Sequence, residues 1–322
     1  MDEFELIRRF WEPLGQKVTH PAVRQGIGND GAVVQVPAGR ELVLSVDTLV
    51  EGVHFPADIA PHALGWRALA VNLSDLAAMG ADPLCYTLAM TLPEPSTGWL
   101  EQFAAGIGEL SARHGIQLVG GDMTRGPLTV TIQVQGLVPA GGALGRDGAR
   151  PGDLICVSGT LGDAGEALNW LGWPVAESSE VRTVLQRYHY PEPRLTLGQA
   201  LRGRASAAID VSDGLMADLT HILQASGCGA RVDYQCLPVS GALQALAGEV
   251  CRRAAAAAGD DYELCFTWPG TEDTLKALSA AGQVPVTVIG RIESQPGLRL
   301  MDGDEPLELG VAGYRHFPEE EG

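Results

Sequence analysis

Residues 68–83 read ALAVNLSDLAAMGADP, and this stretch decides how the rest of the chain is interpreted. Apolar residues such as Leu69 and Leu73 recur at three- and four-residue spacing, which predicts an amphipathic helix. Asp75 is the one charge on this helix, at the edge of the face expected to be buried. A buried carboxylate is costly unless it is paired or bound to metal, so Asp75 is either a capping aspartate or part of a metal site.

Similar aspartates follow apolar runs or glycine turns along the whole chain. The set is Asp30, Asp47, Asp75, Asp122, Asp210 and Asp213. Clustered carboxylates repel one another unless a cation lies between them. Oxygen ligands favour hard ions, Mg²⁺ above all, and Mg²⁺ commonly accompanies phosphates. Turn and cap aspartates would explain any one position, but the recurring order of strand and then Asp favours a magnesium site that handles phosphate groups.

The composition narrows the class of protein. A chain of 322 residues with 45% hydrophobic and 19% charged residues is folded and suits two domains. Its net charge of −18 argues against a nucleic acid or an anionic membrane as partner. No apolar run is long enough to span a bilayer. The six cysteines form no CxxC pair, which favours free thiols in a reducing cytoplasm and makes a zinc site improbable.

Two glycine-rich stretches raise the question of how phosphate would be bound. GIGNDGA at 26–32 fits the pattern GxGxxG, but a strand and then Pro37 follow where a dinucleotide site needs a helix. The VAIK, HRD and DFG motifs of protein kinases are absent, as is the lysine-containing P-loop. Gly120-Gly121 is expected to be a turn whose N–H groups can face phosphate, and Arg146 can add a guanidinium. A solvated loop is the alternative for Arg146.

Strand and helix patterns alternate in both halves, which predicts an α/β or α+β fold. The patterns place helices at 3–14, 96–114 and 162–171 and strands at 32–36, 41–47, 86–92, 128–138, 154–159, 262–266 and 285–292. The segment 139–153 is rich in Gly and Pro and lacks periodicity, so it is the expected boundary between domains at 1–148 and 149–322. His54 follows one strand, and a lone histidine is more often structural than functional.

Six stretches together resemble one known family. They are GIGNDGAV (26–33), SVDTLVEGVHF (45–55), NLSDLAAMGADP (72–83), VGGDMTRGPL (119–128), AIDVSDGL (208–215) and GDDYELCF (259–266). In this order they resemble the thiamine-monophosphate kinases, which belong to the aminoimidazole-ribonucleotide-synthetase-like superfamily. The resemblance implies ATP-dependent phosphorylation of thiamine monophosphate to thiamine diphosphate with several Mg²⁺ ions. It also implies an N-terminal sheet domain that binds ATP and Mg²⁺ and forms a homodimer, and a C-terminal α/β domain that completes the active site.

The resemblance also implies roles for individual residues. Magnesium ligands would be Asp30, Ser45, Val46, Asp47, Asp75, Asp122, Asp210 and Asp213. ATP contacts would be Gly121, Asp122, Arg146 and Ser212, and thiamine monophosphate contacts would be His54, Asp260 and Tyr314. Catalysis would rest on Asp75, Asp122 and Arg146.

Three positions depart from the pattern of the family. Asn29 stands where Asp is common, Val46 where a hydroxyl residue is common, and Asp260 where Glu is common. Val46 can still offer its backbone carbonyl to a metal, whereas Asp260 has a shorter reach to a substrate. The alternatives are another ATP-using member of the superfamily, a metal-dependent phosphohydrolase, or a non-catalytic nucleotide-binding regulator. A selenophosphate synthetase needs a reactive Cys near its N-terminus, and here the first cysteine is Cys85.

Overall fold

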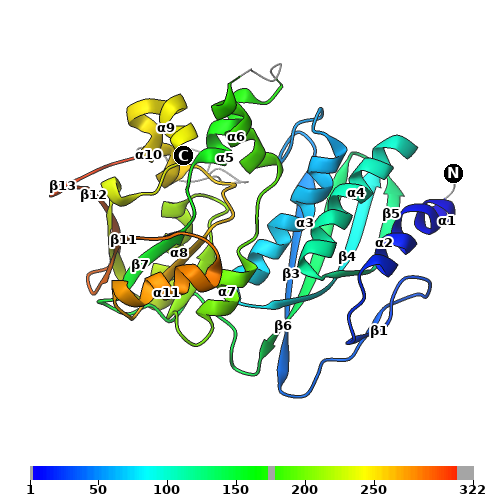
Figure 1. The fold of residues 1–322 in the computed structure, drawn as a ribbon, viewed down its shortest axis with the longest axis horizontal. Helices are drawn as coiled ribbons and strands as arrows, with labels where there is room; N and C mark the ends of the chain where they lie inside the picture. The colour runs from blue at the N-terminus through cyan, green and yellow to red at the C-terminus, as the bar shows by residue number, and fades with distance from the viewer. Residues whose placement is uncertain (1–2, 173–177, 310–322) are drawn as a thin grey trace, which may run out of the picture. The chain divides into compact units, whose positions relative to one another are not determined.

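The computed structural model describes residues 3–172 and 178–309, which form two compact units (Figure 1). Of the described residues, unit 1 comprises 3–76, 81–143 and 189–195, and unit 2 comprises 77–80, 144–172, 178–188 and 196–309. Each unit holds one main sheet with helices, so the predicted mixture of helix and sheet is confirmed. The chain passes from unit 1 to unit 2 between Ala143 and Leu144, inside the Gly- and Pro-rich segment 139–153. Within the described ranges, no helix is long and apolar enough to cross a membrane.

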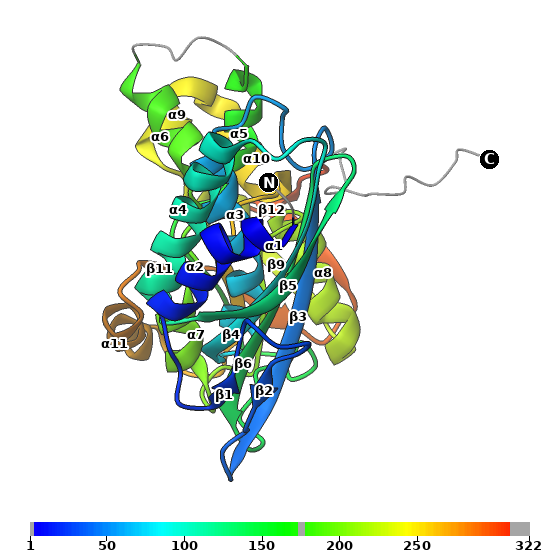
Figure 2. The same ribbon diagram turned by 90° about the vertical axis from the view of Figure 1, so that its right-hand side faces the viewer.

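Unit 1 is built on a four-stranded sheet in the order β3-β6-β4-β5. Its strands are β3 (Arg40–Val50), β6 (Thr129–Pro139), β4 (Asp82–Leu92) and β5 (Gln117–Arg125). Only β4 and β5 are parallel, and the other neighbours are antiparallel. Helices α3 (Pro61–Ala78) and α4 (Thr97–His114) lie along one face of this sheet (Figure 2). A small hairpin of β1 (Val23–Gln25) and β2 (Val33–Val34) precedes it, so the strand expected at 32–36 is shorter than predicted.

The central helix predicted from residues 68–83 is confirmed, with different ends. It begins at Pro61 and ends at Ala78, because Gly80 adopts φ +66°, which closes the helix, and Asp82 already belongs to β4. Gly65 of α3 and Gly106 of α4 let the backbones of these two helices come into contact where the helices cross. A Cβ added to Gly65 would lie 2.2 Å from the carbonyl oxygen of Phe103, and the helices would have to separate.

The N-terminal helix predicted at 3–14 is also present but irregular. It consists of α1 (Glu3–Leu6), a π-helical turn η1 (Ile7–Trp11) and α2 (Glu12–Lys17). The π turn buries Phe10 and Trp11, and the Trp11 ring meets the Phe103 ring edge-on with centroids 6.2 Å apart. The irregular turn therefore lets two consecutive aromatic residues face the interior of unit 1.

The two faces of the unit 1 sheet differ in chemistry. On the face away from α3, β3 exposes Leu42, Leu44 and Val46, with exposed fractions of 38%, 55% and 56%. The strand register continues this face across the sheet, since Thr48 pairs with Thr131, Thr131 with Ala89, and Ala89 with Asp122. We call this surface the open face. It places an apolar strand at one edge of the sheet and Asp122 at the other edge.

Unit 2 is built on a seven-stranded sheet in the order β13-β12-β9-β11-β7-β10-β8. Its strands are β7 (Leu154–Ser158), β8 (Ala207–Asp210), β9 (Gly229–Asp233), β10 (Leu264–Trp268), β11 (Val286–Glu293), β12 (Gly297–Asp302) and β13 (Glu305–Pro306). Its helices are α5 (Asp163–Ala167), α6 (Ser179–His189), α7 (Leu195–Leu201), α8 (Leu215–Ser226), α9 (Gly241–Ala247), α10 (Cys251–Ala257) and α11 (Glu272–Gly282). The helix predicted at 162–171 therefore ends early, and the 3₁₀ turn η2 (Leu168–Trp170) follows it.

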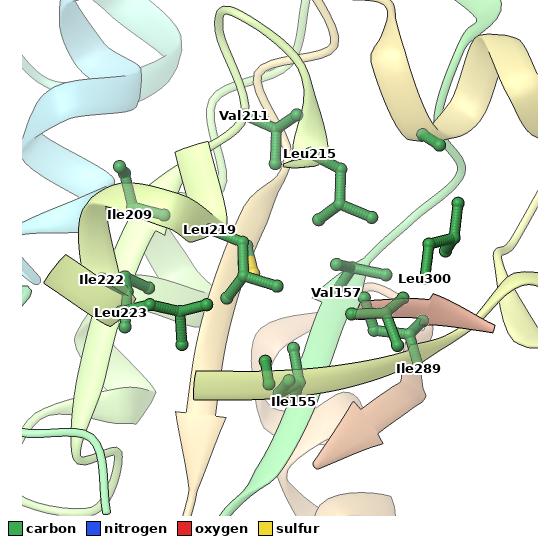
Figure 3. Packing of buried hydrophobic residues seen from close by; sticks show 14 of the residues in the cluster. Ile155, Val157, Ile209, Val211, Leu215, Leu219, Ile222, Leu223, Ile289 and Leu300 are labelled. Atoms are coloured by element: carbon green, nitrogen blue, oxygen red, sulfur yellow. The ribbon is translucent and has the colours of Figure 1, made fainter. Parts of the chain in front are cut away.

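Helix α8 is anchored by a large hydrophobic cluster (Figure 3). Leu215, Leu219 and Ile222 of the helix belong to the same buried cluster as Ile155 and Val157 of β7. Each of these side chains is almost fully buried, which contributes roughly 1.5–3 kcal/mol per residue relative to exposure. The N-terminus of α8, and the turn that leads into it, is therefore fixed on the sheet.

Candidate active site

The strand β3 and the helix α3 bring three of the predicted residues together. The hydroxyl of Ser45 donates a hydrogen bond to the carboxylate of Asp75, and the backbone N–H of Asp47 donates to the side-chain oxygen of Asn72 at 3.0 Å. Ser45 and Asp47 alternate along β3 and so face α3. Asn72 lies one turn before Asp75 on the helix. The sequence analysis missed Asn72, although the spacing NLSD places it on the same face.

The segment Gly120-Gly121-Asp122 is not a turn, so that prediction is wrong. All three residues lie inside β5 and pair with Thr87, Leu88 and Ala89 of β4. A Cβ on Gly121 would lie 1.8 Å from the Leu88 carbonyl oxygen, so glycine serves a close approach of two strands. Because β5 is an edge strand, its outer N–H groups remain unpaired by the sheet.

Asp122 lies apart from Asp47 within one chain. Asp122 is on the open face at the β5 edge, whereas Asp47 faces α3 on the β3 edge. Three interstrand spacings separate the two strands, which amounts to about 14 Å. One metal ion therefore cannot bind both carboxylates of the same chain.

Two further predicted residues of unit 1 lie in loops. Asp30 is exposed in the loop between β1 and β2. His54 is half-buried after β3, and its Nδ1 accepts a hydrogen bond from the Val50 backbone N–H at 3.0 Å. This bond places the ring proton of neutral His54 on Nε2. Val46 points its side chain outward on the open face.

In unit 2 the predicted residues Ser212 and Asp213 form the turn between β8 and α8. Asp218, in the first turn of α8 and 3% exposed, shapes this turn. Its Oδ2 accepts hydrogen bonds from the backbone N–H groups of Ser212, Asp213 and Gly214 at 3.0, 3.1 and 3.1 Å. Burial raises the pKa of Asp218 to about 7, while the three N–H donors lower it. The sequence analysis did not single out Asp218.

The loop that carries Asp260 is tied to this turn. Asp260 and Tyr262 both adopt left-handed backbone conformations, with φ +68° and +51°. The N–H of Asp260 donates to the Ser212 carbonyl at 2.8 Å, and the Tyr262 hydroxyl donates to Asp260 Oδ1 at 3.0 Å. Such strained residues cluster at functional sites. The left-handed residues also explain why the strand predicted at 262–266 begins only at Leu264.

The remaining predicted residues of unit 2 are placed as follows. Asp210 ends β8 and is buried, with 5% exposure. Arg146 is exposed, and its carbonyl accepts a hydrogen bond from the Ser226 hydroxyl at 2.9 Å. Its neighbour Gly145 is held next to β8, because the Gly145 carbonyl accepts from the Ala208 N–H at 2.9 Å. Tyr314 lies outside the described residues.

The donor chemistry fits Mg²⁺ better than a transition metal. Within residues 3–172 and 178–309, no three or more His, Cys, Asp or Glu side chains are grouped so that they could hold a metal. Ser45, Asp47 and Asp75 nonetheless offer only oxygen atoms, and Mg²⁺ keeps several waters and needs only one or two carboxylates.

Comparison with known proteins identifies the family. The model of the AIR synthase related protein N-terminal domain matches residues 28–144, and the model of its C-terminal domain matches residues 150–303. The thiamine-monophosphate kinase of Salmonella typhimurium is 48% identical over 322 residues, covering 98% of each chain, and that of Escherichia coli K12 is 46% identical over 323 residues, again covering 98% of each. The chain belongs to the thiamine-monophosphate kinase family.

Solved structures agree with this membership of the thiamine-monophosphate kinase family. The thiamine-monophosphate kinase of Stenotrophomonas maltophilia superimposes with a TM-score of 0.86 at 45% identity, covering 93% of this chain and 96% of that one. The structure of AaThiL complexed with AMPPCP and TMP has a TM-score of 0.77 at 31% identity, covering 98% and 97%. The hydrogenase maturation protein HypE, at 20% identity and a TM-score of 0.73, shares the fold alone.

Beneath the Asp260 loop, this kinase family member has a buried charged cluster that the sequence analysis missed. Arg187 of α6 donates to Glu263 Oε1 at 2.7 Å, and Ser158 donates to Glu263 Oε2 at 2.5 Å. Asp261 accepts from the Gly162 N–H at 2.7 Å, and its Oδ1 has no hydrogen-bond partner among the described residues. Burial lowers the pKa of Arg187, but the negative charges around it, Glu263 first, outweigh this effect and raise that pKa. Burial raises the pKa of Asp261 well above its usual range.

Proposed function

We propose that this protein transfers the γ-phosphate of ATP to thiamine monophosphate and so forms thiamine diphosphate. The observation that carries the proposal is the likeness to AaThiL complexed with AMPPCP and TMP, at 31% identity over nearly the whole chain. The identity of 48% to the thiamine-monophosphate kinase of Salmonella typhimurium supports the same activity. The protein is then a transferase of thiamine biosynthesis.

The transfer is direct and in-line. The acceptor is a phosphate whose oxygen is already ionised, so the protein needs no strong general base. Mg²⁺ would supply the positive charge that the phosphates require. The chain supplies its ligands from Asp30, Ser45, Val46 by its carbonyl, Asp47, Asp75, Asp122, Asp210 and Asp213. Arg146 adds positive charge, and Gly121, Asp122 and Ser212 help to position ATP.

Three residues are assigned to thiamine monophosphate, namely His54, Asp260 and Tyr314. His54 positions the substrate through Nε2–H, since its Nδ1 is held by the Val50 N–H. Asp260 is shorter than the usual Glu, but the hydroxyl of Tyr262 fixes its direction. These residues bind and orient the substrate, and proton exchange by them is not required.

We further propose that the protein is a homodimer that buries the open face. Leu44 and Val46 are more than half exposed there, and they lie on an edge strand that would gain partners. A second copy could also bring an Asp122 close to Asp47, because the β5 edge of one copy can meet the β3 edge of the other. Each metal site would then take its Asp122 from the partner subunit.

Leu44→Glu is expected to convert the dimer to monomers and to reduce turnover at least about tenfold, since a charge replaces an apolar contact. Analytical ultracentrifugation and the kinase assay measure the two effects. Val250→Glu is the matched control, because Val250 is 56% exposed in unit 2 and Leu44 is 55% exposed. A Leu44→Glu protein that is as dimeric and as active as the control would contradict the proposal.

The direct test is to incubate the protein with ATP, Mg²⁺ and thiamine monophosphate and to separate the products. We expect thiamine diphosphate in a one-to-one ratio with ADP, and its loss when EDTA removes the metal. ATP hydrolysis at an undiminished rate without thiamine monophosphate would instead indicate a phosphohydrolase. Binding of ATP without any product would indicate a regulator.

The compartment we propose is the cytoplasm. All six cysteines are free, and five of them are buried, which suits a reducing environment. Fractionation of the native protein with cytoplasmic marker enzymes tests this assignment.

A further inference from the structure

The turn Ser212-Asp213-Gly214 has the backbone form of an anion site. Three successive N–H groups converge on one point, and Gly214 with φ +115° permits this curvature. Such a concave array of N–H groups, at the N-terminus of α8, ordinarily binds phosphate or another anion.

In this protein the carboxylate of Asp218 already occupies the anion position. Asp218 Oδ2 accepts all three N–H groups at 3.0–3.1 Å, and the side chain is 3% exposed. The N–H groups are therefore saturated and cannot face the phosphates of ATP. What the turn can still present is the hydroxyl of Ser212 and the carboxylate of Asp213, both from half-buried residues.

We propose that Asp218 is a positioning residue that converts this turn from an anion site into a cation-binding site. By holding the three N–H groups it fixes the backbone from which Asp213 and Ser212 project, and it prevents phosphate from taking the place of the metal. This inference rests on the proposed function, in which Asp213 binds Mg²⁺ and Ser212 contacts ATP.

The surroundings of the turn support a role in positioning. The Ser212 carbonyl accepts a hydrogen bond from the Asp260 N–H at 2.8 Å, and the Val211 carbonyl accepts from the Tyr262 N–H at 2.8 Å. The turn is thus held on one side by Asp218 and on the other by the strained loop 260–262. A shift of the turn would therefore move three assigned residues together: Asp213 for the metal, Ser212 for ATP and Asp260 for the substrate.

The test compares Asp218→Ala and Asp218→Asn with the wild type across a Mg²⁺ titration. We expect Asp218→Ala to lower kcat about 10- to 100-fold and to raise the Mg²⁺ concentration for half-maximal rate, as for other residues that orient metal ligands. Asp218→Asn keeps one oxygen that can accept N–H groups, so we expect it to recover a substantial part of both effects. All rates are expressed per folded molecule, with the folded fraction taken from circular dichroism.

Asp233→Ala is the matched control in the same unit. Asp233 also accepts a backbone N–H, that of Gln235 at 2.9 Å, but it caps the 3₁₀ turn η3 (Tyr234–Cys236) and not the turn 212–214. We expect this variant to keep the Mg²⁺ dependence of the wild type. Unchanged Mg²⁺ dependence in Asp218→Ala, or a loss no larger than the loss of folded protein, would overturn the proposal.

A binding measurement separates this inference from the proposed function. Calorimetry of AMPPCP at several Mg²⁺ concentrations needs no turnover, and we expect weaker Mg²⁺-dependent binding in Asp218→Ala than in Asp233→Ala. If the wild type forms no thiamine diphosphate, the proposed function fails, whereas equal AMPPCP binding by both variants overturns the role of Asp218.

Discussion

Asp75→Asn is expected to reduce thiamine diphosphate formation to less than about one hundredth of the wild-type rate, even at saturating Mg²⁺. The carboxylate of Asp75 accepts a hydrogen bond from the Ser45 hydroxyl and lies on α3 one turn after Asn72, whose side-chain oxygen accepts one from the Asp47 N–H. Removing its charge takes away one of the carboxylates that we propose as magnesium ligands. Because the phosphates and the polypeptide are both anionic, the proposed function needs cations, and we propose that Asp75 is one of their ligands.

The fold should survive this change, because Asn is isosteric with Asp and can still accept the hydrogen bond from Ser45. The thermal unfolding temperature should therefore change little, while kcat falls more than about a hundredfold. Asp82→Asn is the control, since Asp82 pairs with Arg40 in the same unit and is assigned no role in the reaction. Turnover of Asp75→Asn near that of the control would refute the central place of Asp75 in metal binding.

The sequence predicts the secondary structure well where the hydrophobic period is long. The patterns predict helix α4 and strands β6 and β11 within one residue of their observed bounds, because their apolar residues repeat over several turns of helix or several residue pairs of a strand. The prediction at 86–92 finds the end of β4 but misses its first four residues. The prediction of a turn at Gly120-Gly121 is wrong, because glycine next to an apolar run usually marks a turn but here lies inside β5. Here Gly121 serves instead a contact with the Leu88 backbone, which no local pattern can reveal.

The sequence predicts the candidate site less completely. Ser45, Asp47 and Asp75 belong to motifs that resemble a known family, and the structure brings them together. Asn72 and Asp218 accept hydrogen bonds from backbone N–H groups of other residues. The spacing NLSD places Asn72 beside Asp75, but no pattern in the sequence marks Asp218 as an acceptor for the turn before it. Arg187 and Glu263 are 76 positions apart, so only the tertiary fold makes them partners.

The same pair gives the largest expected effect on stability. Glu263 is fully buried, and the guanidinium of Arg187 lies 2.7 Å from its carboxylate. Arg187→Met would remove this positive charge from beside buried Glu263, while the negative groups Asp163 and Asp261 stay in the same cluster. Removing one partner of a buried ion pair costs about 3–5 kcal/mol, and we expect the unfolding free energy of unit 2 to fall by this amount. Urea unfolding followed by tryptophan fluorescence measures it.

The double variant Arg187→Met with Glu263→Gln tests whether the loss of unfolding free energy comes from the charge of Glu263. If it does, the double variant should be more stable than Arg187→Met alone, because the neutral amide has no charge to desolvate. The loss in Arg187→Met should also be smaller at pH 5 than at pH 8, since a buried carboxyl group that has lost a cationic partner takes up a proton more readily as the pH falls. Arg299→Met is the control, because the Arg299–Glu293 pair of unit 2 is partly exposed and should be worth about 0–1 kcal/mol. Equal losses in Arg187→Met and Arg299→Met would contradict the argument.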